Sequence, residues 1–117
     1  MTTLITCVST GKGTWSHVSQ LMNCDTWFRI ILVTNDFGKE KFTHEKPHEF
    51  LVVDENLSIV QLRDTLVTQL QEKRIGDVAV NLYSGSGKEH MALLSALLRL
   101  GVGIRFVIPE QTSVVEI

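Results

Sequence analysis

Runs of hydrophobic residues divide the sequence into short segments that predict strands. Phe28–Thr34 is a continuous apolar run rather than an alternating one, which is typical of a strand covered on both faces in a parallel sheet. Clusters of glycine, proline and polar residues separate the other runs. Further strands are predicted at Thr3–Ser9, Phe50–Val53, Val78–Tyr83, Val102–Ile108 and Thr112–Ile117. A tight connection through Pro109 joins the last two.

Segments with apolar residues at helical spacing lie between these strands. Trp15–Met22 is the first of them. A second helix is expected to begin after Ser58, which forms a capping box with Gln61, and to end near Gly76. A third helix is predicted over Ser86–Leu100.

The alternation of strands and helices predicts one three-layer, Rossmann-like α/β domain over residues 1–117. Short connections favour a mostly parallel sheet of about six strands. The two C-terminal strands are expected to form an antiparallel hairpin at one edge. We interpret the polar segment Asn35–Pro47 as a loop and as a candidate lid.

The net charge of the protein argues against one class of function, the binding of long nucleic acids. The chain has 117 residues and a formal net charge of −2, whereas a domain that tracks long DNA or RNA usually has a strong basic excess. A small anionic ligand held by a few local groups remains compatible with this charge. We therefore expect no long nucleic acid as a partner.

The sequence predicts a cytoplasmic protein without a membrane span. The most apolar stretch, Met91–Ile108, contains Arg99 and Arg105, and no leader peptide precedes the first strand. Cys7 and Cys24 do not make the several pairs of a disulfide-rich secreted domain.

Two turns are candidates for the functional site. Each places glycines, hydroxyls and one lysine between a strand and a helix, so that backbone amides, the helix end and the lysine can meet an anion. Because ligands of open parallel sheets bind beyond the carboxyl ends of the strands, we expect the two turns to lie side by side and to bind phosphate. They are Ser9-Thr10-Gly11-Lys12-Gly13-Thr14 and Ser84-Gly85-Ser86-Gly87-Lys88.

Neither turn matches a known nucleotide fingerprint. A Walker A loop fails around Gly87-Lys88 because Leu82 and Glu89 stand where glycine and a hydroxyl are needed. The dinucleotide pattern fails in the first turn because His17 follows its two glycines. A purely structural alternative also stays open, since Ser86 and Glu89 fit a capping box.

The second turn and the helix after it, from Asn81 to Gly101, resemble CRISPR-associated Rossmann-fold (CARF) domains. The hydroxyl-to-lysine spacing of Ser84 and Lys88 matches that family, and Ser9-Thr10-Gly11 resembles its other signature turn. The family's usual Asp or Asn, two residues before the hydroxyl, is replaced by Leu82 here.

The resemblance implies a homodimer that binds a cyclic oligoadenylate, a second messenger of type III CRISPR antiviral defence, across its two-fold axis. Forms of this family without an effector domain often degrade the messenger and are called ring nucleases. Their chemistry needs neither metal nor cofactor. The alternative is a non-catalytic Rossmann-like sensor or a regulatory interaction module.

The resemblance also implies roles for individual residues. Lys88 would neutralise charge on the reacting phosphate, and Ser9 or Thr10 would orient that phosphate. The expected ligand-binding residues are Gly11, Lys12, Gly13, Thr14, Trp15, Ser84, Gly85, Ser86 and Gly87. In the implied homodimer, the two-fold axis would bring together two copies of Lys12 and two of Lys88. These four lysines would make the ligand pocket locally positive.

The sequence supports three further expectations, which concern the last helix, Trp15 and a pair of histidines. The helix Ser86–Leu100 is apolar nearly all round, which favours burial against a second copy of the chain or under the polar loop. Trp15 is a candidate to stack on adenine or, alternatively, to pack in the core with Trp27. His44 and His48 have a spacing seen in some metal sites, but the proline between them opposes a helix, so no metal site is predicted.

Overall fold

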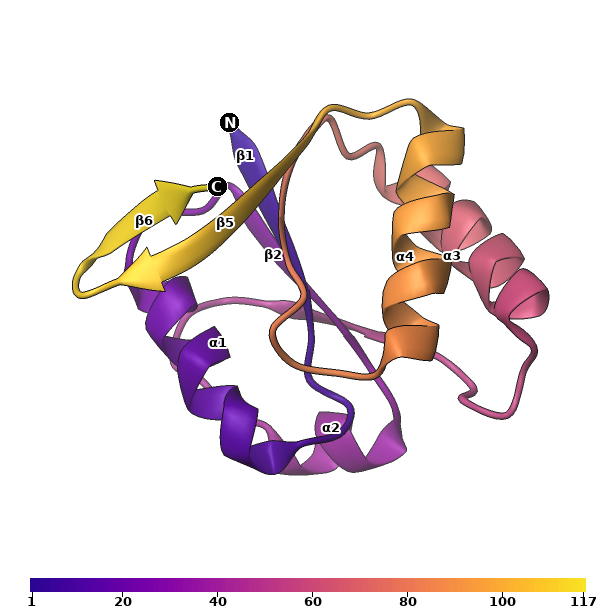
Figure 1. The fold of residues 1–117 in the computed structure, drawn as a ribbon, viewed down its shortest axis with the longest axis horizontal. Helices are drawn as coiled ribbons and strands as arrows, with labels where there is room; N and C mark the ends of the chain where they lie inside the picture. Colours follow the sequence, from indigo (N-terminus) through magenta and orange to yellow (C-terminus); the bar gives the residue numbers. More distant parts are fainter.

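The computed structural model describes all residues from 1 to 117, and a six-stranded sheet runs through its centre (Figure 1). The strand order is β3-β2-β1-β4-β5-β6. Neighbouring strands are parallel except for β5 and β6, which form an antiparallel hairpin at one edge. The strands are β1 (Thr2–Cys7), β2 (Arg29–Thr34), β3 (Glu49–Val52), β4 (Asp77–Asn81), β5 (Ile104–Glu110) and β6 (Ser113–Glu116).

Helices cover both faces of the sheet. On one face α3 and α4 pack against each other, and α1 lies on the other face (Figure 1). This is the mostly parallel three-layer arrangement that the sequence predicts, with its edge hairpin. The helices are α1 (Trp15–Asn23), α2 (Asp36–Lys41), α3 (Ile59–Lys73) and α4 (Gly87–Leu100), and a short 3-10 turn η1 (Lys12–Thr14) precedes α1.

Each face of the sheet has its own hydrophobic core. Strand residues such as Ile31 and Val80 pack with Leu66 of α3 and Leu93 of α4, and all four side chains are fully buried. The opposite core holds eleven buried residues, chiefly from α1 and the other faces of the same strands. Strands buried on both faces explain the uninterrupted apolar runs in the sequence.

Both predicted capping boxes are present. The Ser58 hydroxyl accepts from the Gln61 backbone N–H at 3.1 Å, and the Gln61 side chain accepts from the Ser58 N–H at 3.0 Å. However, α3 ends at Lys73 and not near Gly76. Arg74 adopts the left-handed conformation, with φ of 53°, and so closes the helix itself.

The prediction of a continuous loop from Asn35 to Pro47 was wrong because α2 forms within it. The Asn35 side chain caps this helix by accepting from the Gly38 N–H at 2.9 Å. Gly38 is buried against Thr34 and the Val8 carbonyl, where a Cβ atom would clash with both. A helix of six residues with a largely charged sequence carries no amphipathic stripe by which it could be recognised.

The apolar helix α4 is covered mostly by its own chain. Ala92, Leu93, Ala96 and Leu97 are fully buried against α3 and the sheet, so the polar loop does not cover them. Among the large apolar side chains of the helix, only Met91 and Leu98 are strongly exposed, at 64% and 73%. None of the helices combines the length and the apolar character needed to cross a membrane.

Candidate functional site

The two candidate turns lie side by side at the carboxyl edge of the sheet. They follow β1 and β4, which are parallel neighbours, with Thr6 opposite Asn81 at the end of the pairing. The Thr14 and Ser84 hydroxyl oxygens are 2.7 Å apart, and the Ser84 hydroxyl also donates to the Thr10 carbonyl at 3.4 Å. The juxtaposition that the topology rule predicts is therefore confirmed.

The first turn presents a row of free backbone N–H groups. Gly11 adopts a left-handed conformation, with φ of 65°, which an L-residue reaches only with strain. The Thr14 N–H donates to the Gly11 carbonyl at 2.7 Å, whereas the N–H groups of residues 10 to 13 donate to no group within the chain. Thr10, Lys12 and Gly13 are exposed, so these donors can meet a ligand.

The second turn is built tightly against the end of β1. Gly85 has φ of 98°, and a Cβ atom there would stand 2.7 Å from the Cβ of Cys7. Ser86 caps α4 and forms the predicted capping box with Glu89. The backbone N–H groups of Gly87 and Lys88 have no acceptor within the chain, so the helix end retains two free donors.

Glu89 joins the two turns. Its carboxylate is 3% exposed, and Oε1 accepts from the Ser9 hydroxyl of the first turn and from the Ser86 N–H, the latter at 2.9 Å. The other oxygen, Oε2, is buried without a partner. Burial and the nearby Glu89 charge together raise the pKa of the Cys7 thiol, which is therefore protonated and unreactive.

This contact changes the role predicted for Ser9. The hydroxyl is 1% exposed and its only proton is committed to Glu89, so it cannot also donate to a bound phosphate. Thr10 is exposed and its hydroxyl makes no hydrogen bond within the chain. Of the two, only Thr10 offers a free hydroxyl at the surface of the site.

The two lysines differ in their surroundings. The Lys88 ammonium group donates to the backbone carbonyl of Glu55 at 2.7 Å, and Lys12 is exposed. Neither forms an ion pair with a carboxylate, so both charges remain uncompensated at short range. Lys88 holds the second turn close to the loop that follows β3.

Of the two alternatives for Trp15, packing in the core beside Trp27 is confirmed, and stacking on a ligand is contradicted by its burial. Trp15 is 7% exposed and belongs to the core beneath α1. Its ring lies edge-on to Phe42, with centroids 5.6 Å apart, and tilted against Phe37 at 6.0 Å. The aromatic residue at the site is instead Tyr83, which is 63% exposed.

Tyr83 stacks on His17 of α1, with ring centroids 3.9 Å apart and planes within 9°. The Asn81 amide sets this arrangement: its oxygen accepts from the Tyr83 N–H at 3.1 Å, and its nitrogen lies 3.0 Å from His17 Nε2. His17 thus accepts a hydrogen bond at Nε2, and burial lowers its pKa. The sequence carried no signal for this stack, since the two residues are far apart along the chain.

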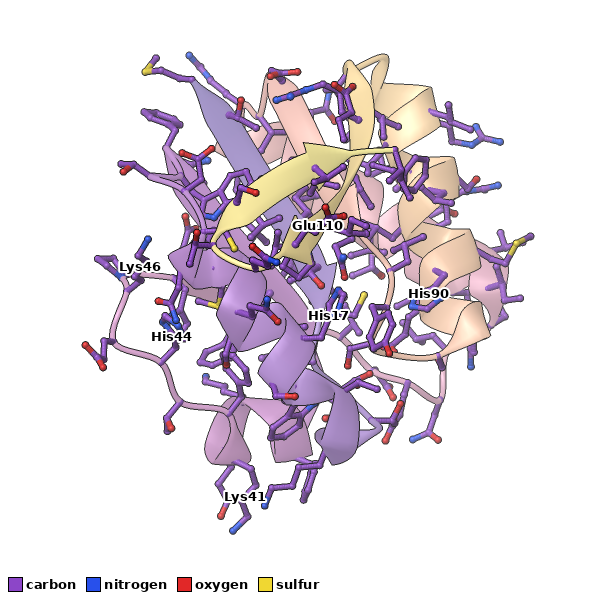
Figure 2. The ribbon with its side chains drawn as sticks, turned by 60° about the vertical axis from the view of Figure 1, so that its left-hand side comes forward. His17, Lys41, His44, Lys46, His90 and Glu110 are labelled. Atoms are coloured by element: carbon purple, nitrogen blue, oxygen red, sulfur yellow. The ribbon has the colours of Figure 1, made fainter.

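Figure 2 shows where three of the histidines lie relative to this edge. His17 lies near the middle of the view, His90 lies on the first turns of α4, and His44 and Lys46 lie together on a distant loop. His90 Nε2 donates to the Ser84 carbonyl at 2.8 Å, which helps to hold the second turn. No group of three or more His, Cys, Asp or Glu side chains is arranged to hold a metal ion.

A hollow of about 310 Å³ lies further along the same edge, between the ends of β2 and β3. Its lining includes Asp36, Asp54 and Glu55, so it is acidic, in contrast to the turns. Asn35 donates to the Glu55 carboxylate across it at 3.0 Å. An anion is therefore favoured at the turns and disfavoured in this hollow.

Comparison of the sequence with protein-family models and with curated proteins finds no match to either. The two adjacent turns carry free N–H groups, the exposed Thr10 hydroxyl, and two lysines that form no ion pair. This combination can bind a phosphate group and stabilise negative charge developing on it.

Proposed function

We propose that this protein binds a cyclic oligoadenylate between two copies of the chain and cleaves it without a metal ion. The observation that carries the proposal is the row of unpaired backbone N–H groups at residues 10 to 13, beside the free N–H groups of Gly87 and Lys88. Donors of this kind, at a helix N-terminus and a glycine-containing turn, are suited to phosphodiester oxygens.

The charges support a small polyanion as the ligand. The protein as a whole carries −2, so it lacks the strong basic excess typical of domains that bind long nucleic acids. Lys12 and Lys88 supply two positive charges at the turns, and a two-fold axis would double them to four. A ring of phosphodiesters matches such a small, local positive region better than a duplex does.

The proposed reaction is an internal transesterification. A ribose 2′-oxygen attacks the adjacent phosphorus atom while the bond from phosphorus to the 5′-oxygen breaks. The 2′-hydroxyl loses its proton to solvent and the departing 5′-oxygen gains one, which leaves a cyclic 2′,3′-phosphate and a free 5′-hydroxyl. The protein contributes by holding the attacking oxygen in line and by stabilising charge on the phosphorane.

Two side chains are assigned to this step. Lys88 would neutralise the developing charge, and the exposed Thr10 hydroxyl would orient the phosphate with the neighbouring amides. Ser9 becomes a positioning residue, because its hydroxyl holds Glu89 and thereby sets the distance between the turns.

The proposed dimer rests on α4. Met91 and Leu98, separated by two turns of the helix, lie on the same exposed side and are 64% and 73% accessible. Large apolar side chains grouped in this way favour contact with another protein surface. Sedimentation equilibrium tests this point separately: a mass of one chain at all concentrations would contradict a site shared between two copies.

The decisive experiment incubates the protein with cyclic tetra-adenylate and cyclic hexa-adenylate in EDTA and follows the products by chromatography. We expect linear products with a cyclic phosphate end, and a loss of about 100-fold or more in rate for Lys88→Ala. Lys46→Ala is the matched control, because Lys46 also donates to a backbone carbonyl at 2.7 Å but lies on the distant loop.

The outcomes separate the candidate functions. Binding of a ring without any product would favour the non-catalytic sensor. No change in melting temperature with either ring would overturn both nucleotide functions and favour an interaction module. Equal rates for Lys88→Ala and Lys46→Ala would show that cleavage does not use this site.

A further inference from the structure

An exposed aromatic ring stands directly beside the second turn. Tyr83 is the chain's single tyrosine and immediately precedes Ser84. One face of its ring is covered by His17, and 63% of the residue is exposed to solvent. A large aromatic side chain held in place yet left open is a surface on which another flat ring can stack.

Hydrogen bonds of the buried Asn81 side chain position both residues of the stack. Asn81 is 3% exposed and hydrogen-bonds to the Tyr83 backbone, to His17 and to the Val107 carbonyl, the last at 2.9 Å. The Asn81 side chain therefore has all its polar atoms occupied. A ring held in this way loses little freedom when a ligand stacks on it.

Next to this ring lies an apolar hollow of about 220 Å³, where β4 and β5 separate. Seven of its eight lining residues are hydrophobic, and they include Leu82, Tyr83, Phe106 and Ile108. The hollow is smaller than the roughly 300–1,000 Å³ that is typical of sites for drug-sized ligands. Its size and lining suit one flat heterocycle and not a helix or a peptide segment.

We propose that Tyr83 and this hollow form a nucleobase subsite, which takes an adenine of the ligand whose phosphate lies on the two turns. This inference rests on the proposed function for the identity of the base. The turns supply donors and positive charge only, so they cannot distinguish a nucleotide from inorganic phosphate. The hollow supplies the missing part: an apolar, aromatic surface whose Tyr83 immediately precedes Ser84 of the second turn.

NMR can test this proposal because Tyr83 is the single tyrosine of the chain. With ring-labelled tyrosine, one set of aromatic NMR signals reports on this residue alone. The protein is titrated separately with cyclic tetra-adenylate, with adenosine, which lacks phosphate, and with ribose 5-phosphate, which lacks the base. Amide signals of Gly11 and Gly87 report on the turns in the same spectra.

We expect cyclic tetra-adenylate and adenosine to move the Tyr83 ring signals upfield, and ribose 5-phosphate to move only the amides of the turns. If the cyclic ligand moves the amides and leaves the Tyr83 ring unchanged, the subsite is overturned while the phosphate site stands. If adenosine moves the ring but the cyclic ligand does not reach the amides, the subsite stands and the proposed function fails. If neither cyclic tetra-adenylate nor adenosine moves the ring signals, the hollow is not a base site.

Three variants make the result quantitative. Tyr83→Ala is expected to weaken binding of cyclic tetra-adenylate about 5- to 150-fold, the range for losing one stacked base. Tyr83→Phe keeps the ring and should bind within about twofold of the unchanged protein. Phe28→Ala is the control for loss of an exposed aromatic ring, since Phe28 is 58% exposed at the opposite, amino-terminal end of the strands.

Discussion

Replacing Glu89 tests whether one buried carboxylate holds the two turns together. In Glu89→Ala the Ser9 hydroxyl and the Ser86 N–H both lose their acceptor. A buried polar group left without a partner costs about 1–3 kcal/mol, and loss of a helix cap about 0.5–2 kcal/mol. These effects overlap at Ser86, so we expect the free energy of unfolding to fall by about 2–4 kcal/mol.

Glu89→Gln separates the hydrogen bonds from the charge. Glutamine keeps a carbonyl oxygen where Oε1 stands, so Ser9 and Ser86 retain an acceptor, but the charge is lost and the amide NH2 takes the place of the buried, unpartnered Oε2. We expect a loss of about 1–2 kcal/mol for this variant, because that NH2 group has no acceptor. Glu72→Ala is the control, because Glu72 is exposed on α3 and should change stability by less than about 0.5 kcal/mol.

Urea unfolding followed by tryptophan fluorescence measures all three variants against the unchanged protein. The slope of free energy against urea concentration should be the same for each, since a similar surface is exposed on unfolding. The reasoning is refuted if Glu89→Ala unfolds at the same urea concentration as Glu72→Ala.

Other positions give independent expectations. Gly85→Ala should lower the melting temperature by several degrees, since its positive φ and the nearby Cys7 leave no room for Cβ; an unchanged melting temperature would contradict the geometry of the turn. Leu66→Ala should cost about 2–5 kcal/mol in urea unfolding because it opens a cavity between α3 and the sheet. The pKa of His17 lies below its ordinary value of about 6.5, so the unfolded chain takes up the proton first as pH falls and stability should decline below about pH 6.5. His17→Gln should show a smaller decline in unfolding experiments between pH 7.5 and 5.5, and an equal decline would assign the effect to other groups.

The mostly parallel sheet and its edge hairpin could be predicted because most of their signals are local, whereas the order of the strands was not predicted. Apolar runs such as Phe28–Thr34 report burial on both faces, and the two capping boxes place the starts of α3 and α4 directly in the sequence. The meeting of the two turns also followed, since the carboxyl ends of parallel strands share one edge. By contrast, α2 is held by Asn35 and by the close approach of Gly38 to β1 and β2, which is a tertiary effect.

The fine structure of the site was not predictable for the same reason. Glu89 shows its capping role in the sequence, but nothing there indicates that it also binds Ser9, eighty residues away. Trp15 has the same helical register whether it faces the core or a ligand, and only packing against Phe42 decides between them. The stack of His17 and Tyr83 likewise depends on how α1 lies over β4.

The position of β1 in the middle of the sheet has a consequence for the order of folding. β1 pairs with β2 nearby in sequence, but its pairing with β4 joins residues about 75 positions apart, such as Thr2 and Asp77. Closing so long a loop is slow compared with forming local contacts. The two turns come together only when β4 pairs with β1. A partly folded chain in which only β1 to β3 are paired therefore has the first turn in place but not the second. Acquisition of ligand affinity during refolding would therefore mark the moment at which the two halves of the sheet join.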